Sequence, residues 1–168
     1  MTIRIVTDSV CDIPRITAEA YGIIIVPAYL NIGGRSFLDG IDLSRQQFYE
    51  DLPHYSTPPT TAAPAPGAFT EAYEKLASEG ASQILSIHVS STLSGLLNAA
   101  RLGSEAIVSV DVTLVDSQQL TMGLGLLAIA AAEAAEAGRS MDEIVTILND
   151  KVQRTYVIGL LDTLEYLR

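Results

Sequence analysis

The chain has 168 residues, of which 48% are hydrophobic, so it is long enough to bury one substantial core and we expect a single domain. Ten basic against twenty acidic side chains give a formal charge of -10, a field that repels nucleic-acid phosphates and anionic membrane surfaces and argues against nucleic acid as a partner. Cys11 cannot form an internal disulfide, no apolar signal core follows Met1, and no apolar run reaches the roughly 20 residues that span a bilayer, so we expect a cytoplasmic protein without a membrane span.

The first part of the chain predicts a strand, a helix and a second strand that continues into a hairpin. Residues 3–7 are a short β-branched run, and residues 13–21 are typical of a helix. The next apolar stretch, 23–32, is interrupted by one proline and ends at Gly33-Gly34, a pair that tolerates the positive φ of a tight hairpin. We therefore expect a strand with a hairpin extension here.

The middle of the chain alternates between apolar strands and amphipathic helices. Ser44 is a good N-cap for one helix, and the proline-rich residues 58–66 predict a loop after it. The pattern then predicts a helix at 66–78, a strand at 82–89, a helix at 93–108 and a strand at 112–115. Such alternation implies right-handed crossovers, so we expect an α/β fold with three layers, α/β/α, and a mainly parallel sheet.

The last part predicts two helices, a strand and the start of a further helix. An alanine-rich helix follows Leu120, and Ser140 with Glu143 three residues later forms a capping box for the next helix. Residues 156–161 are typical of a strand, and residues 162–168 begin a helix that has no C-cap. An uncapped terminal helix suggests a chain cut before its natural end, with frayed termini as the other explanation.

Small polar residues follow the predicted parallel strands, at the sheet edge where ligands of open α/β folds bind. Together with two threonines of the proline-rich loop they are Asp8, Ser9, Thr60, Thr61, Ser90, Ser91, Thr92, Ser94, Gly95, Asp116 and Ser117. Residues 90–95 precede a helix, whose free N–H groups and dipole favour a carboxylate or phosphate. Any one such segment is explained by ordinary helix capping, so the prediction of an anion site depends on several of them converging.

Catalysis finds little support in the sequence. The chain has His54 in a predicted loop and His88 in a predicted strand, which we interpret as a packed strand residue, and it has no Gly-x-Ser-x-Gly motif. Asp8 stands where an aspartyl-phosphate nucleophile would, but Val10 replaces the second acid. We expect that the protein is not itself an enzyme and that it binds neither a metal nor a cofactor. The alternatives are a small phosphate- or ester-processing enzyme that uses Asp8 and residues 90–94, and an interaction domain whose hydroxyls are all caps.

Five collinear segments resemble the DegV family of bacterial fatty-acid-binding proteins, and the resemblance extends over essentially the whole chain. The opening segment 7–14 reads Thr-Asp-Ser-Val-Cys-Asp-Ile-Pro, similar to the family's T-D-S-x-x-D-[IL]-P. The other four segments are Val26-Pro27 with residues 34–40, residues 61–69, residues 90–95 and residues 116–125. Each segment alone is weak, and their common order makes the match specific.

The resemblance implies a function and a set of site residues. Thr61 and Ser94 would hydrogen-bond the carboxylate of a long-chain fatty acid, with the other polar residues at this edge as a supporting pocket and the tail in an apolar tunnel. A partner fatty-acid kinase, similar to dihydroxyacetone kinases, would phosphorylate the presented acid. Residues 1–168 would be the N-terminal lipid-binding lobe, without the second lobe that closes the pocket. Ala62, Ala65, Leu96 and Thr121 depart from the residues common in the family.

Overall fold

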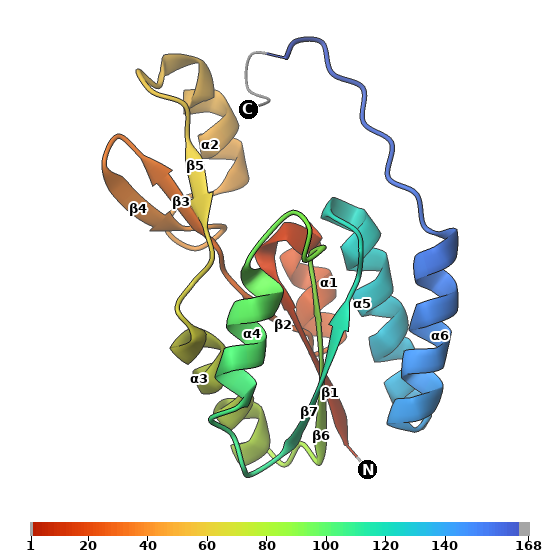
Figure 1. Ribbon diagram of the computed structural model, residues 1–168. Helices are drawn as coiled ribbons and strands as arrows, with labels where there is room; N and C mark the ends of the chain where they lie inside the picture. Colours follow the sequence, from red (N-terminus) through yellow and green to blue (C-terminus); the bar gives the residue numbers. More distant parts are fainter. Residues whose placement is uncertain (1, 165–168) are drawn as a thin grey trace.

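The computed structural model describes residues 2–164 and contains a four-stranded parallel sheet at its centre (Figure 1). The strand order is β2-β1-β6-β7. The bounds are β1 Ile3–Asp8, β2 Ile24–Val26, β6 Gln83–His88 and β7 Asp111–Asp116. All neighbouring strands of this sheet run parallel, with Val6 of β1 opposite both Ile24 and Ser86. Their carboxyl ends therefore meet at one edge, as the alternating sequence pattern predicts.

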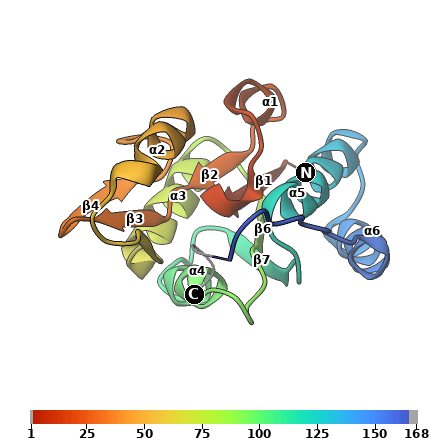
Figure 2. The same cartoon turned by 90° about the horizontal axis from the view of Figure 1, so that it is seen from above.

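Helices cover both faces of this sheet, which gives the predicted three layers (Figures 1 and 2). One face carries α3 and α4, and the other carries α1, α5 and α6. The bounds are α1 Arg15–Ala20, α3 Pro66–Ser78, α4 Leu96–Ser104, α5 Thr121–Glu136 and α6 Met141–Arg154. The capping box that opens α6 is present, because Ser140 accepts from Glu143 N–H and the Glu143 carboxylate accepts from Ser140 N–H. The three-layer α/β/α prediction is confirmed.

A second, smaller sheet stands above the carboxyl ends of the parallel strands together with the short helix α2 (Figure 1). Its three strands are antiparallel in the order β4-β3-β5. The bounds are β3 Tyr29–Ile32, β4 Arg35–Leu38, β5 Thr60–Ala62 and α2 Arg45–Asp51. Gly33 and Gly34 have φ of 57° and 78°, which only glycine adopts readily, and they form the predicted hairpin turn.

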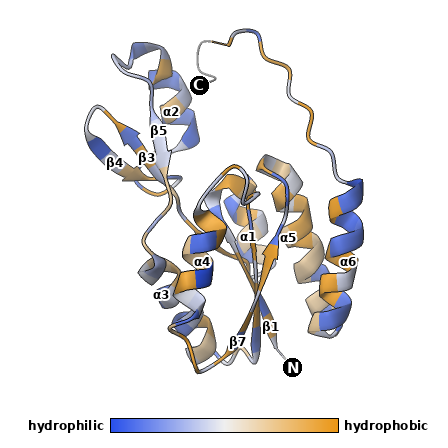
Figure 3. Ribbon diagram, in the orientation of Figure 1, coloured by the Kyte–Doolittle hydropathy of each residue, from blue (hydrophilic) through white to orange (hydrophobic). Residues whose placement is uncertain are grey.

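The core lies on both sides of the parallel sheet. Phe69, Tyr73 and Leu76 of α3 are fully buried against one face. On the other face the alanine-rich α5 is apolar along most of its length (Figure 3) and buries residues such as Leu124. A Cβ at Gly125 would collide with the carbonyl oxygen of Cys11, so this glycine allows the close packing that the sequence indicates.

The structure corrects three predictions. Residues 60–62, predicted as loop, form β5, because two β-branched threonines pair with the free side of β3. Residues 156–161 are extended but belong to no strand, since no neighbouring strand pairs with them. Residues 162–164 are not helical, and the rest of the predicted terminal helix, 165–168, lies outside the described residues. Within residues 2–164, no helix is long and apolar enough to cross a membrane.

Candidate functional site

The carboxyl ends of β1, β6 and β7 are tied together by hydrogen bonds, so the polar residues that follow these strands gather at one edge. The Asp8 carboxylate accepts from Val89 N–H at 3.0 Å, which joins the end of β1 to the end of β6. Ser117 N–H donates to the His88 carbonyl at 3.1 Å, which joins β6 to the segment after β7. The convergence that the sequence predicts for these three segments is therefore present.

Asp8 is fully buried and its side chain is occupied. One oxygen accepts from Val10 N–H, and the other accepts from Val89 N–H and contacts His88 Nδ1, each at 3.0 Å. A nucleophilic aspartate needs an exposed oxygen without such partners. The alternative in which Asp8 performs phosphate or ester chemistry therefore loses its nucleophile.

His88 is buried in β6 as predicted, and it belongs to a hydrogen-bonded chain that the sequence does not reveal. Its Nε2 lies 2.7 Å from Ser86 Oγ, and Ser86 Oγ lies 2.8 Å from the Tyr73 hydroxyl. Burial raises the pKa of Tyr73 to about 12, with the Ser86 hydroxyl acting in the opposite direction. The order of serine, histidine and aspartate resembles a catalytic triad, but all of its members are fully buried, so no substrate can reach the serine.

Residues 90–95 form the loop between β6 and α4. Ser90 is buried: its N–H donates to the Gln119 carbonyl at 2.9 Å, and its hydroxyl lies 2.9 Å from that of Thr92. The Ser91 hydroxyl donates to Asp116 at 2.6 Å. These bonds fix the loop from both sides, so Ser90, Ser91, Thr92 and Asp116 stabilise the site through their mutual contacts.

Ser94 is the hydroxyl of this loop that is best placed to bind an anion. It is half-buried, and its oxygen accepts from Leu96 N–H at 3.3 Å, at the start of α4. The Ser94 O–H proton has no acceptor among the bonds found in residues 2–164, so it is available to a ligand. Gly95 beside it is exposed and its backbone is open to contact.

The other supporting residues divide into two kinds. Ser9 and Ser117 have internal roles, since Ser9 Oγ accepts from Ala28 N–H at 3.1 Å and Ser117 Oγ accepts from Gln119 N–H at 3.1 Å. Thr60 and Thr61 lie in β5 and are exposed. Over residues 2–164, the hydroxyl of neither threonine has a hydrogen-bond partner, and no bond joins Thr61 to Ser94.

Three residues in the left-handed region surround the same edge of the sheet, and the sequence gives no sign of them. Asp12 has φ of 55°, Gln118 of 53° and Thr121 of 50°. For a β-branched residue such as Thr121 this conformation is costly. Strained backbone of this kind concentrates at ligand sites, where the surrounding contacts hold it in place.

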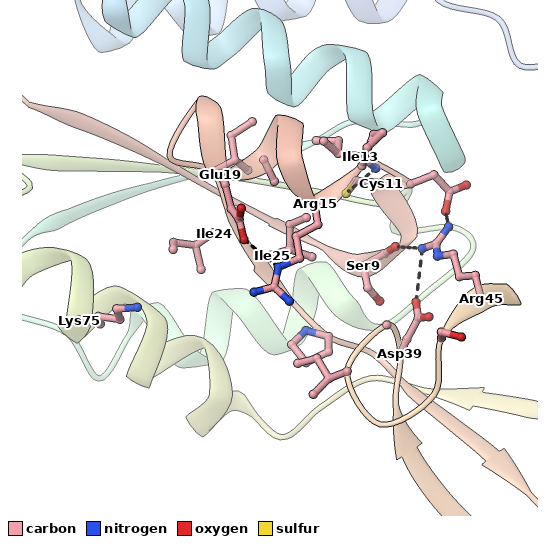
Figure 4. Close-up of a pocket in the computed structure, with 18 residues that line it drawn as sticks. Ser9, Cys11, Ile13, Arg15, Glu19, Ile24, Ile25, Asp39, Arg45 and Lys75 are labelled. Atoms are coloured by element: carbon pink, nitrogen blue, oxygen red, sulfur yellow. Dashed lines mark hydrogen bonds and ion pairs between the residues drawn. The ribbon is translucent and has the colours of Figure 1, made fainter. Parts of the chain in front are cut away.

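A cavity of about 840 Å³ lies beside the edge strand β2, between η1 (Ser9–Cys11), α1 and the start of α2. Its walls are mainly apolar and include Ile13, Ile24 and Ile25. Arg45 reaches across one end to the Ser9 carbonyl, Asp12 and Asp39 (Figure 4). Ser9 alone of the predicted site residues lines this cavity, so it is separate from the predicted head-group site. No group of metal-binding side chains occurs within residues 2–164.

Comparison with known proteins gives consistent matches. A family model described as "Uncharacterised protein, DegV family" matches residues 2–168. A DegV domain-containing protein of Streptomyces coelicolor is 38% identical over 166 residues, which are 99% of this chain and 58% of the relative. A DegV domain-containing protein of Deinococcus radiodurans is 38% identical over 168 residues, which are 100% of this chain and 59% of the relative.

Solved structures show the same fold. A DegV family protein from Thermus thermophilus, described by its fatty-acid binding, has a TM-score of 0.84 and 31% identity, over 91% of this chain and 54% of that one. DegV from Bacillus subtilis, described as a fatty-acid-binding protein, has a TM-score of 0.86 and 29% identity, over 91% of this chain and 54% of that one. The chain thus spans little more than half the length of the proteins it matches.

Proposed function

Since the chain belongs to the DegV family, we propose that it binds a long-chain fatty acid by its carboxylate and presents the acid to a partner fatty-acid kinase. Residues 1–168 act as the N-terminal lipid-binding lobe of the protein. The observation that carries the proposal is the Ser94 hydroxyl: its oxygen accepts from Leu96 N–H at the start of α4, and its proton has no acceptor within residues 2–164. Solved relatives from Thermus thermophilus and Bacillus subtilis are described as fatty-acid-binding, which supports the choice of ligand.

The head group is held by neutral donors. Ser94 and Thr61 each offer a hydroxyl proton that has no acceptor in the part of the chain that the structure describes, and the N-terminal end of α4 adds a favourable dipole. A hydrogen bond to a charged group contributes about 1.5 to 3 kcal/mol. A carboxylate suits this site better than an alcohol, because the alcohol carries no charge to strengthen the bonds.

The hydrocarbon tail supplies most of the affinity. Burial of about fifteen methylenes at roughly 0.8 kcal/mol each gives a gross contribution on the order of 12 kcal/mol. That contribution requires removal of the tail from water. The head group therefore sets the orientation, and the tail sets the strength of binding.

The carrier and the kinase divide the work. The carrier orients the carboxylate at the open edge of the sheet, and the kinase supplies the nucleotide and the phosphoryl-transfer chemistry. Ser94 and Thr61 are at most half-buried, so the head group that they hold faces outward, within reach of a partner. Incubation of the acid-loaded carrier with kinase and ATP is expected to give an acyl phosphate, and none without carrier.

The test of binding is native mass spectrometry of the purified protein at its full natural length. We expect a long-chain acid to co-purify, and expect Thr61→Val, which keeps the shape and removes the hydroxyl, to reduce acid binding more than binding of the alcohol of equal length. No ligand, and no binding of added hexadecanoic acid, would favour the interaction-domain alternative. Turnover of generic phosphate or ester substrates would favour the enzyme alternative.

A further inference from the structure

A chain of polar side chains runs through the core between α3 and the carboxyl end of β1. The members are Tyr73, Ser86, His88 and Asp8, each with 0% exposure. Consecutive contacts are 2.8 Å from the Tyr73 hydroxyl to Ser86, 2.7 Å from Ser86 to His88 and 3.0 Å from His88 to Asp8. The ring of Phe69 packs edge-on against His88 with centroids 5.1 Å apart, which holds the imidazole in this orientation.

The contacts define the direction of the hydrogen bonds. The Asp8 oxygen already accepts from Val89 N–H, so it accepts from His88 Nδ1–H as well. In a neutral imidazole the other nitrogen then has no proton and accepts from the Ser86 hydroxyl. Ser86 in turn accepts from Tyr73, so each of these four side chains has its hydrogen-bond partners. Within residues 2–164, His88 is thus the one side chain that donates to Asp8.

Asp8 is connected through hydrogen bonds to both of the segments that carry the predicted head-group residues. On one side it accepts from Val89 N–H, and the next residue, Ser90, accepts from Ser94 N–H at 3.1 Å through its carbonyl. The backbone of Ser94 is therefore two hydrogen bonds and one peptide unit away from Asp8. A shift of the Asp8 carboxylate would be passed to the Ser94 hydroxyl.

On the other side Asp8 accepts from Val10 N–H, which sets the turn that contains Ser9. Ser9 Oγ accepts from Ala28 N–H, and Ala28 leads directly into β3. Leu30 of β3 pairs with Thr61 in β5. Asp8 therefore stands where the connections to Thr61 and to Ser94 meet, although neither residue contacts it.

We propose that His88 is a positioning residue for the carboxylate site, because its Nδ1–H orients the Asp8 carboxylate from which the Thr61 and Ser94 segments are held. This inference rests on the proposed function and names the device that fixes the geometry of its head-group donors. Two hydroxyls on separate segments recognise one carboxylate only when their spacing is fixed to within about 0.5 Å. A buried, fully satisfied pair of this kind supplies that rigidity.

Two substitutions separate the two nitrogens of His88. The amide nitrogen of asparagine occupies the place of Nδ1, so His88→Asn keeps a donor to Asp8 and loses Ser86. The longer glutamine places its amide near Nε2, so His88→Gln keeps Ser86 and loses the donor to Asp8. Tyr73→Phe is the matched control, because it removes a buried hydroxyl from the same chain without touching Asp8.

The readout is the preference for hexadecanoic acid over hexadecanol in the full-length protein. It is measured as the Kd of hexadecanol divided by the Kd of hexadecanoic acid. We expect His88→Gln to lower this ratio about tenfold, and His88→Asn and Tyr73→Phe to keep it within about twofold. A purely structural role would weaken acid and alcohol binding in parallel and would follow the loss of thermal stability. An unchanged ratio in His88→Gln would overturn the inference.

A spectroscopic measurement covers the case in which His88→Gln does not fold. The Nδ1–H proton of His88 in the unsubstituted protein is shielded from solvent by its bond to Asp8 and is observable by NMR. We expect its resonance to move when the acid binds and to stay when the alcohol binds. No movement with bound acid would also overturn the inference.

If Thr61→Val and Ser94→Ala leave acid binding intact, the proposed function itself fails, and this result is distinct from a failure of His88 alone.

Discussion

The hydroxyl oxygen of Ser94 accepts a hydrogen bond from the backbone N–H of Leu96, 3.3 Å away, at the start of α4. Ser94→Ala removes both this hydrogen bond and the hydroxyl proton that the proposed function assigns to the ligand. We expect a loss of about 1 kcal/mol in the free energy of unfolding, the usual net contribution of one hydrogen bond, and about tenfold in affinity for hexadecanoic acid. Denaturant unfolding and a fluorescence displacement assay measure the two effects.

Ser104 provides a control on the same helix. Its hydroxyl donates to the Arg101 carbonyl at 2.8 Å, at the opposite end of α4 from the predicted site. Ser104→Ala should leave acid affinity unchanged, and Ser94→Thr should keep most of it, because threonine retains the hydroxyl. Full acid affinity in Ser94→Ala would remove this residue from the head-group site.

Gly125 in α5 lies against the turn that follows β1. A Cβ there would overlap the Cys11 carbonyl oxygen and approach the Ile13 side chain to 3.0 Å. Because the obstacle is backbone, Gly125→Ala requires the helix or the turn to move, and we expect a loss of about 2 kcal/mol in the free energy of unfolding. Chemical denaturation of the two proteins measures it.

Gly67 in α3 is the matched position without an obstacle. Nothing lies within 4 Å of a Cβ built there, and its φ is not positive. Gly67→Ala should therefore be neutral or should stabilise the protein by up to about 1 kcal/mol, as expected for a helix. Equal stability changes at the two glycines would contradict the packing argument for Gly125.

The parallel sheet and the gathering of polar residues at its edge could be predicted from the sequence because they depend on local patterns. The β-branched run at residues 3–7 predicts a strand, and the aspartate at position 8 follows it directly. Parallel strands place all such successors at one edge, so the convergence follows from the fold class. The hydrogen bonds from Ser91, after β6, to Asp116, at the end of β7, are an example of this rule.

Other features depend on which distant segments meet, and no local pattern contains that information. His88 and Asp8 are 80 positions apart, and their contact results from the pairing of β1 with β6. Residues 60–62 become a strand because β3 has a free side, although prolines around them predict a loop. Residues 156–161 carry a strand pattern and stay unpaired, which shows that hydropathy alone does not supply a partner strand.

Cys11 makes the stability of the protein sensitive to alkaline pH. Burial raises the pKa of its thiol from 9.0 to about 11, although the Ile13 N–H acts against the shift. The unfolded chain then loses its proton at lower pH than the folded one. Below about pH 9 the thiol is protonated in both states, so it does not affect the free energy of unfolding. As the pH rises from about 9 to about 11, the thiol ionises first in the unfolded chain, which lowers the free energy of unfolding by a total of about 3 kcal/mol.

Unfolding by denaturant at about pH 8 and about pH 10.5 measures this loss, with Cys11→Ala as the comparison. The variant should show a smaller decrease, because the thiol that titrates is gone. Some decrease should remain, since burial also raises the pKa of Tyr73 to about 12. An identical decrease in both proteins would show that the thiol is not the group responsible.

The Asp8 carboxylate receives N–H donors at both of its oxygens, from Val10 at 3.0 Å and from Val89 at 3.0 Å. Asp8→Asn keeps the shape of the side chain but turns one acceptor into an NH₂ group that faces donors. We expect a loss of about 2 kcal/mol in the free energy of unfolding. Asp12→Asn is the control: Asp12 has φ of 55°, a conformation that asparagine tolerates well, so its loss should be small.

The same geometry predicts that Asp8 does not accept a phosphoryl group. A nucleophilic oxygen must approach phosphorus in line and without competing donors, whereas both Asp8 oxygens are buried and hydrogen-bonded. Intact-mass measurement after incubation with acetyl phosphate and Mg²⁺ should therefore show no added phosphoryl group in the folded protein. A phosphorylated peptide that contains Asp8 would mean that the carboxyl end of β1 opens in solution. That result would favour the enzyme alternative over the proposed carrier.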